Sequence, residues 1–78
     1  MASSIVEPQE IFRKAILESA SRIILVHNHP TGDLEPSSED IAITKKVKEA
    51  GELIGIDVLD HIIVGDSAYV SLKDRGII

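Results

Sequence analysis

The sequence predicts a single α/β domain, an α+β-type mixed sheet with helices, in the order helix, strand, helix, strand, strand. Two segments carry apolar residues at helical spacing, a short apolar segment follows each of them, and a Gly-Asp-Ser turn at 65–67 separates the last two strands. A strand-helix-strand unit forms a right-handed crossover with parallel strands. The turn then adds a third, antiparallel strand.

The first helix is expected over about residues 8–20. Pro8 suits the first helical position, where its missing N–H costs little. The apolar residues that follow fall on one stripe, namely Ile11, Phe12, Ala15, Ile16 and Ala20. Residues 22–27 contain four consecutive apolar side chains, which predicts a strand covered on both faces, as in a parallel sheet. Two prolines, a glycine and two acidic residues make 28–36 a loop.

The second helix is expected to begin at Ser37-Ser38-Glu39-Asp40 and to stop at Gly55, a frequent residue just past a helix end. Its apolar stripe consists of Ile43, Val47, Ala50 and Ile54. Residues 57–64 and 68–72 are the expected strands of the hairpin, and 73–78 predict no regular element.

The composition limits the class of protein. The chain has no Cys, which excludes disulfides, Cys-based zinc fingers and thiol catalysis. The start shows no signal peptide, and the longest apolar run, Ile23–Val26, is too short to cross a bilayer, so we expect a cytoplasmic protein. The formal net charge of −5 and the two aromatic residues argue against direct nucleic-acid binding by this segment.

The residues that carry chemistry surround the end of the first strand. His27 and His29 are two residues apart, so both point to one side as the strand ends. Asp40 falls in the first turn of the second helix, where the helix dipole favours a carboxylate anion. Two neutral imidazoles and one carboxylate leave a zinc ion an open fourth position, which is the arrangement of a catalytic zinc site.

Structural interpretations stand beside this one. Ser37 and Asp40 have the spacing of a capping box, with Ser37 as the N-cap. Asp33 is a rival ligand, although the Thr-Gly-Asp sequence that contains it is more simply a turn. His61 is expected to be a hydrogen-bonded structural residue. The same set of donors also suits a non-haem Fe(II) site, but those sites commonly lie in all-β barrels.

The spacing of His27, His29, Ser37 and Asp40 resembles the JAMM motif of JAB/MPN+ metallohydrolases. More narrowly, the chain resembles the C-terminal part of bacterial RadC-type proteins over residues 6–78. The matching segments are HNHPTGD (27–33), PSSEDI (36–41), AGELIGIDVLDH (50–61) and DRGII (74–78). Together, these segments are far more specific than a lone His-x-His pair.

The resemblance implies a curved mixed sheet flanked by helices, similar to cytidine deaminases, with residues 1–78 as a single partial JAB/MPN domain. It implies that His27, His29 and Asp40 hold Zn²⁺ and that Ser37 stabilises the oxyanion of a tetrahedral intermediate. The family pattern also includes an upstream strand with a Glu that acts as general acid/base. Neither Glu7 nor Glu10 lies on a strand, so we expect this segment to be inactive alone and to bind zinc weakly or not at all.

Three functions are then in competition. The first is a zinc-dependent metallopeptidase that acts on amide or isopeptide-like bonds of a peptide or protein substrate. The second is a DNA-repair-associated factor, as the RadC name suggests. The third is a non-catalytic interaction module. The intact motif favours the first, and an exposed edge of a partial sheet would invite pairing with a second copy.

Overall fold

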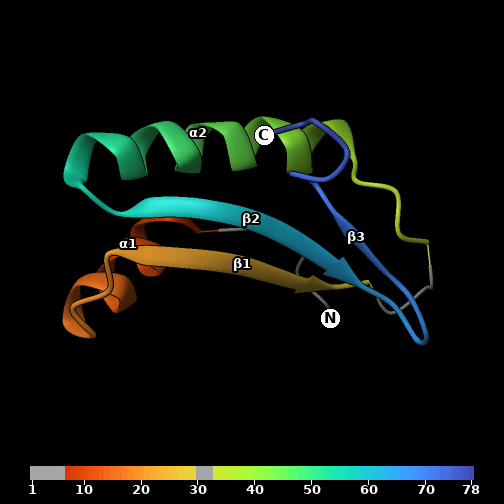
Figure 1. Cartoon of the computed structure of the whole chain (residues 1–78), viewed down its shortest axis with the longest axis horizontal. Helices are drawn as coiled ribbons and strands as arrows, with labels where there is room; N and C mark the ends of the chain where they lie inside the picture. Colours follow the sequence, from red (N-terminus) through yellow and green to blue (C-terminus); the bar gives the residue numbers. More distant parts are fainter. Residues whose placement is uncertain (1–6, 30–32) are drawn as a thin grey trace.

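The computed structural model describes residues 7–29 and 33–78. Its elements are α1 (Pro8–Leu17), β1 (Arg22–Asn28), α2 (Ser38–Ile54), β2 (Asp57–Val64) and β3 (Tyr69–Ser71). The sheet order is β1-β2-β3, with β1 parallel and β3 antiparallel to β2 (Figure 1). The predicted fold class, element order and mixed sheet are therefore confirmed. Part of the predicted loop, 30–32, lies outside the described residues.

Helix α1 ends at Leu17, earlier than the apolar stripe predicted. Ser19 adopts a left-handed backbone conformation, with φ of 56°. The amides of Ser19 and Ala20 donate to the carbonyls of Ile16 and Ala15, which together form a Schellman motif. Ala20 thus lies beyond the helix but still packs against the core, which is why its position fitted the stripe.

The hydrophobic core lies on one side of the sheet, where both helices contribute to it. Alternate residues of a strand point to opposite faces, and Leu25 of β1 lies on the same side as the helices. The buried cluster consists of Phe12, Ala15, Leu25, Val47, Ile56 and Val58. His27 follows Leu25 by two residues, so the strand directs its side chain to this same face.

The opposite face of the sheet is open in the described part of the chain. Ile24 and Val26 alternate with Leu25 and are 53% and 69% exposed, and Tyr69 of β3 is 66% exposed. The prediction that β1 is covered on both faces is therefore wrong. Both helices pack on the side of Leu25, so neither is left to cover the other side. Strand β1 also forms one edge of the sheet, and its pairing with a second copy stays a prediction.

A close approach of backbone segments joins α2 to β2. Gly55 has φ of 82° and ends α2 at the predicted position. The amide of Ile56 donates to the carbonyl of Gly51 at 2.8 Å. A Cβ atom on Gly51 would lie only 2.2 Å from the carbonyl oxygen of Ile56, so this position requires glycine.

Neither helix of the described residues is long and apolar enough to cross a membrane.

These two glycines give a matched pair of substitutions. Gly51→Ala is expected to destabilise the fold by about 2–3 kcal/mol, because the added methyl meets backbone that cannot move aside. In Gly55→Ala the added methyl meets nothing within 4 Å, so the free energy of unfolding should fall only by the cost of the left-handed backbone, about 1 kcal/mol. Urea denaturation of both variants measures the difference. Equal losses would contradict the close approach at Gly51.

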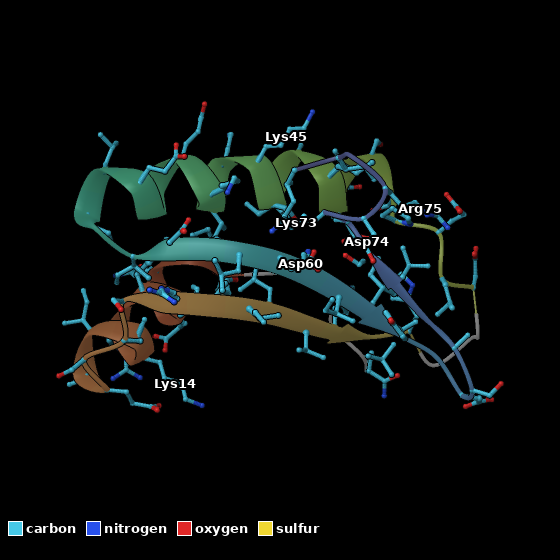
Figure 2. All side chains as sticks on the ribbon, viewed as in Figure 1. Lys14, Lys45, Asp60, Lys73, Asp74 and Arg75 are labelled. Carbon is cyan, nitrogen blue, oxygen red and sulfur yellow. The ribbon has the colours of Figure 1, made fainter. Side chains whose placement is uncertain are left out.

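Asp60 ties β2 to β3 and to the C-terminal segment. Its Oδ1 accepts hydrogen bonds from the amides of His61 at 2.7 Å and Lys73 at 3.0 Å, and its Oδ2 accepts one from the hydroxyl of Ser71. Figure 2 shows Asp60 on β2 beside Lys73. Burial raises the pKa of Asp60, but the hydrogen bonds from Ser71, Lys73 and His61 outweigh it, so the pKa lies below its ordinary value of 3.8.

Asp60→Asn is expected to lower the free energy of unfolding at neutral pH by about 1–3 kcal/mol, because it weakens charge-assisted hydrogen bonds. A depressed folded-state pKa gives stability that is complete above the unfolded-state pKa and disappears as the pH falls through the folded-state pKa. The gap between wild type and variant should therefore narrow as the pH falls below about 4. Denaturant titrations across that range test this, and a gap independent of pH would contradict it.

Candidate metal centre

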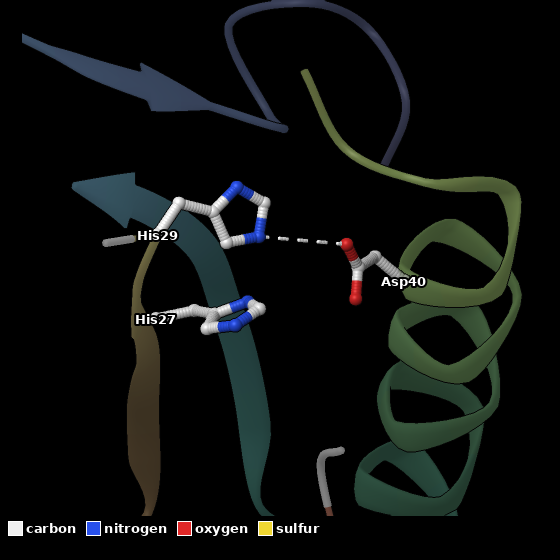
Figure 3. Close-up of side chains that lie close together, drawn as sticks. All are labelled: His27, His29 and Asp40. Atoms are coloured by element: carbon white, nitrogen blue, oxygen red, sulfur yellow. Dashed lines mark ion pairs between the residues drawn. The ribbon is translucent and has the colours of Figure 1, made fainter. Parts of the chain in front are cut away.

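The two strand-end histidines and Asp40 come together at one point of the fold. His27 is the penultimate residue of β1, and His29 directly follows the strand. Asp40 lies in the first turn of α2. Figure 3 shows both imidazoles directed from β1 toward the carboxylate on α2. One ligand atom from each residue lies within 4.8 Å of the other two, so the three could hold one ion. Asp40 is buried and the histidines are half-buried.

The ring of His29 is oriented by a backbone carbonyl. Its Nδ1 lies 2.6 Å from the carbonyl oxygen of Asp33. A carbonyl only accepts, so Nδ1 must carry the proton and donate it. In the neutral ring, Nε2 is then a free lone pair, and it lies 3.9 Å from Oδ2 of Asp40 (Figure 3). This is the tautomer that a metal-binding histidine needs, held by the kind of partner such histidines commonly have.

Asp40 is held by the predicted capping box, which the structure confirms. The amide of Asp40 donates to Oγ of Ser37 at 3.0 Å, and the amide of Ser37 donates to Oδ2 of Asp40 at 3.1 Å. The carboxyl group therefore sits in the first turn of α2, at the positive end of the helix dipole. In the cap, Ser37 uses its oxygen as an acceptor, so its hydroxyl proton stays available to another group.

Asp33 serves the turn, as the sequence predicted, and is not among the clustered residues. Its Oδ1 accepts from the amide of Glu35 at 3.1 Å, while its carbonyl orients His29. Glu35 in turn pairs with Arg75 of the C-terminal segment. Both of these side chains are largely exposed, so the pair adds little stability. Asp33 is thus not a ligand of the cluster but orients one of its members, His29.

His61 lies behind the cluster, and the prediction of a hydrogen-bonded structural histidine is confirmed. It is completely buried on β2, and its Nδ1 lies 2.7 Å from Oγ1 of Thr44 on α2. Its ring stacks on that of His27 with centroids 5.9 Å apart. Burial, with a smaller contribution from the nearby His27, lowers the pKa of His61, which keeps the ring neutral at physiological pH.

Thr44 is the residue that the sequence reasoning missed. Its Oγ1 donates to the carbonyl of Asp40 at 2.6 Å and also contacts His61. It follows Asp40 by four residues, one helical turn, and is fully buried. A polar residue on the apolar side of a helix, one turn after a candidate ligand, was the available signal.

The chain is a mixed-sheet α/β domain in which two histidines and a carboxylate gather at the carboxyl end of a strand. This combination defines the class of α/β domains with a candidate metal centre. The family model for the RadC-like JAB domain matches residues 1–77, and the chain belongs to this family. The resemblance seen in the sequence is thereby confirmed.

Curated relatives carry the name UPF0758 protein. The relative from Methanosarcina acetivorans is 59% identical over 76 residues, which are 97% of this chain and 33% of the relative. The one from Pelobacter propionicus is 63% identical over 75 residues, 96% of this chain and 33% of the relative. The one from Desulforamulus reducens is 62% identical over 76 residues, which are 97% of this chain and 34% of the relative. The chain spans about a third of the length of these relatives.

The capping box predicts a measurable contribution to stability. Ser37→Ala is expected to lower the free energy of unfolding by about 1 kcal/mol, because the amide of Asp40 loses its acceptor. Ser38 is exposed and is the first residue of α2, so Ser38→Ala is the matched control and should change stability little. Thermal denaturation in the presence of a chelator isolates the capping effect. Equal stability of the two variants would contradict the cap.

Proposed function

We propose that this chain is the metal-binding part of a zinc-dependent metallohydrolase that cleaves amide or isopeptide-like bonds in a peptide or protein. The observation that carries the proposal is the cluster of His27, His29 and Asp40 within 4.8 Å. Two nitrogens and one carboxylate oxygen are the donors of catalytic zinc sites that keep one position open. Membership of the RadC-like JAB family supports the same chemistry.

The donors suit zinc in their protonation as well as in their kind. His29 offers an unprotonated Nε2 because the Asp33 carbonyl holds its proton on Nδ1. Asp40 presents its carboxyl group at the N-terminus of α2, where Oδ2 accepts a hydrogen bond from the Ser37 amide. A bound zinc ion supplies Lewis acidity and a water molecule whose pKa is lowered to about 7.

Ser37 has a second role in this proposal. Its oxygen is engaged as an acceptor in the cap, and its side chain is directed to the turn that carries Asp40. The free hydroxyl proton is the donor for an oxyanion that develops on a substrate carbonyl beside the metal. The cap and the catalytic role therefore use different parts of one hydroxyl group.

The proposed reaction also needs a general acid/base, which lies outside these residues. The JAB pattern places a Glu on an upstream strand, whereas Glu10 lies on α1 and pairs with Arg13. We assign full activity to a protein of the relatives' length and expect this segment alone to be inactive. Removal of a general acid/base costs about 10²–10⁴ in rate.

The zinc site is tested by ligand substitutions in the longer protein. His27→Ala, His29→Ala and Asp40→Asn should each weaken zinc affinity by at least about 100-fold, since each removes one of three ligands. Glu39→Gln is the matched control, because Glu39 is an exposed acid in the same helical turn. Chelator competition and elemental analysis measure the affinity and content.

Equal zinc content in all four variants and wild type would contradict the proposed site. Cleavage of an isopeptide-linked or amide substrate tests the reaction separately. Ser37→Ala is expected to lower kcat by about 10²–10³ with zinc retained, as for the loss of one oxyanion donor. Zinc binding with no hydrolysis of any such substrate would instead identify a non-catalytic module.

A further inference from the structure

Two buried ring nitrogens have no hydrogen-bond partner among the described residues. They are Nδ1 of His27 and Nε2 of His61. The rings that carry them are stacked, with centroids 5.9 Å apart and planes inclined by 28°. Buried polar atoms without a partner are rare in folded proteins and call for an explanation. Here the two unpartnered atoms belong to neighbouring rings.

The proton on His61 can be assigned from Thr44. The Thr44 hydroxyl lies 2.6 Å from the carbonyl oxygen of Asp40, which only accepts, so the single hydroxyl proton points there. The Oγ1 of Thr44 must then accept from His61 Nδ1, 2.7 Å away. Nδ1 of a neutral His61 therefore carries the proton, and its buried Nε2 is a lone pair that lacks a donor.

The proton on His27 follows from the position of its two nitrogens. Nδ1 is buried without a partner among the described residues and Nε2 is not, so we take the more accessible Nε2 as the nitrogen that binds the ion. A neutral imidazole that binds through Nε2 carries its proton on Nδ1. Metal-binding histidines almost always donate that second N–H to an acceptor. His27 thus needs an acceptor, and His61 has one to offer.

We propose that His61 is a positioning residue of the metal centre, whose Nε2 accepts from Nδ1–H of His27 through one bridging water molecule, while its Nδ1–H donates to Thr44. The proposal rests on the proposed function, since it takes His27 and Asp40 as ligands. Two links of the resulting path, from His61 to Thr44 and from Thr44 to the backbone of Asp40, are direct hydrogen bonds, and the bridging water would extend the path to His27.

Such a path couples three elements of the fold. His27 comes from β1, His61 from the adjacent parallel strand β2, and Thr44 and Asp40 from α2. The ring of one ligand and the helical turn of another are then oriented by the same buried side chain. A histidine that merely holds Thr44 in the core would not need a defined partner for Nε2.

The first experiment is ¹⁵N NMR of the histidine rings in the metal-free chain at fixed neutral pH. Wild type should show both His27 and His61 protonated on Nδ1. His61→Asn and His61→Gln place the same amide group at different distances from the backbone. The Asn amide lies near the position of Nδ1, and the Gln amide lies near the position of Nε2. His27 should keep its Nδ1–H tautomer in the Gln variant and lose it in the Asn variant.

A His61 protonated on Nε2, or a His27 tautomer that is the same in both variants, would overturn the proposal. Should the His61 variants fail to fold, Thr44→Val and Thr44→Ser replace them, because only Ser keeps the hydroxyl. Thr44→Val should shift the His61 Nδ1–H signal as its acceptor disappears, and Thr44→Ser should preserve that signal. No difference between these two would also overturn the proposal.

The second experiment measures zinc affinity in the longer protein by chelator competition. His61→Asn is expected to weaken zinc binding by about tenfold, the effect of losing an outer hydrogen-bond partner, whereas His61→Gln should stay within about threefold. Equal affinities of both variants and wild type would refute a positioning role. A wild type that binds no zinc would refute the proposed function, and the tautomers would then decide the His27–His61 contact alone.

Discussion

The reciprocal hydrogen bonding of Ser37 and Asp40 is the interaction on which the other features of this structure depend. It begins α2, and it places a carboxylate at the positive end of that helix. From that start, the helix places Thr44 against His61 and Val47 in the core. A shift of the helix start by one residue would rotate all of these side chains away from the sheet by about 100°.

The strand side of the centre depends on a different constraint, the alternation of side chains in β1. Leu25 belongs to the core, and His27 follows it on the same face, so packing of the strand against the helices also aims the first ligand. His29 lies beyond the strand and is aimed instead by the Asp33 carbonyl. Each of the three candidate ligands is thus oriented by backbone or core contacts made within these residues, which is the preorganisation that a metal site requires.

Local signals predicted most of this arrangement, and long-range contacts account for what they missed. The capping box, the Gly55 stop and the His-x-His spacing each depend on residues a few positions apart, and each is found as predicted. The contact of Thr44 with His61 joins residues 17 positions apart, which no local pattern encodes. The apolar run of β1 indicated burial but could not reveal which elements are present to cover Ile24 and Val26.

The open face and the candidate centre lie on opposite sides of the sheet, and this separation has a consequence for function. Ile24 and Val26 point away from the helices, whereas His27 points toward them. A partner bound to the outer face would therefore not have to touch the metal ligands. Ligand orientation comes from contacts within these residues, while the proposed acid/base comes from outside them. Changes at His61 or Thr44 should accordingly act on metal affinity, whereas loss of the proposed upstream Glu should act on the rate of catalysis.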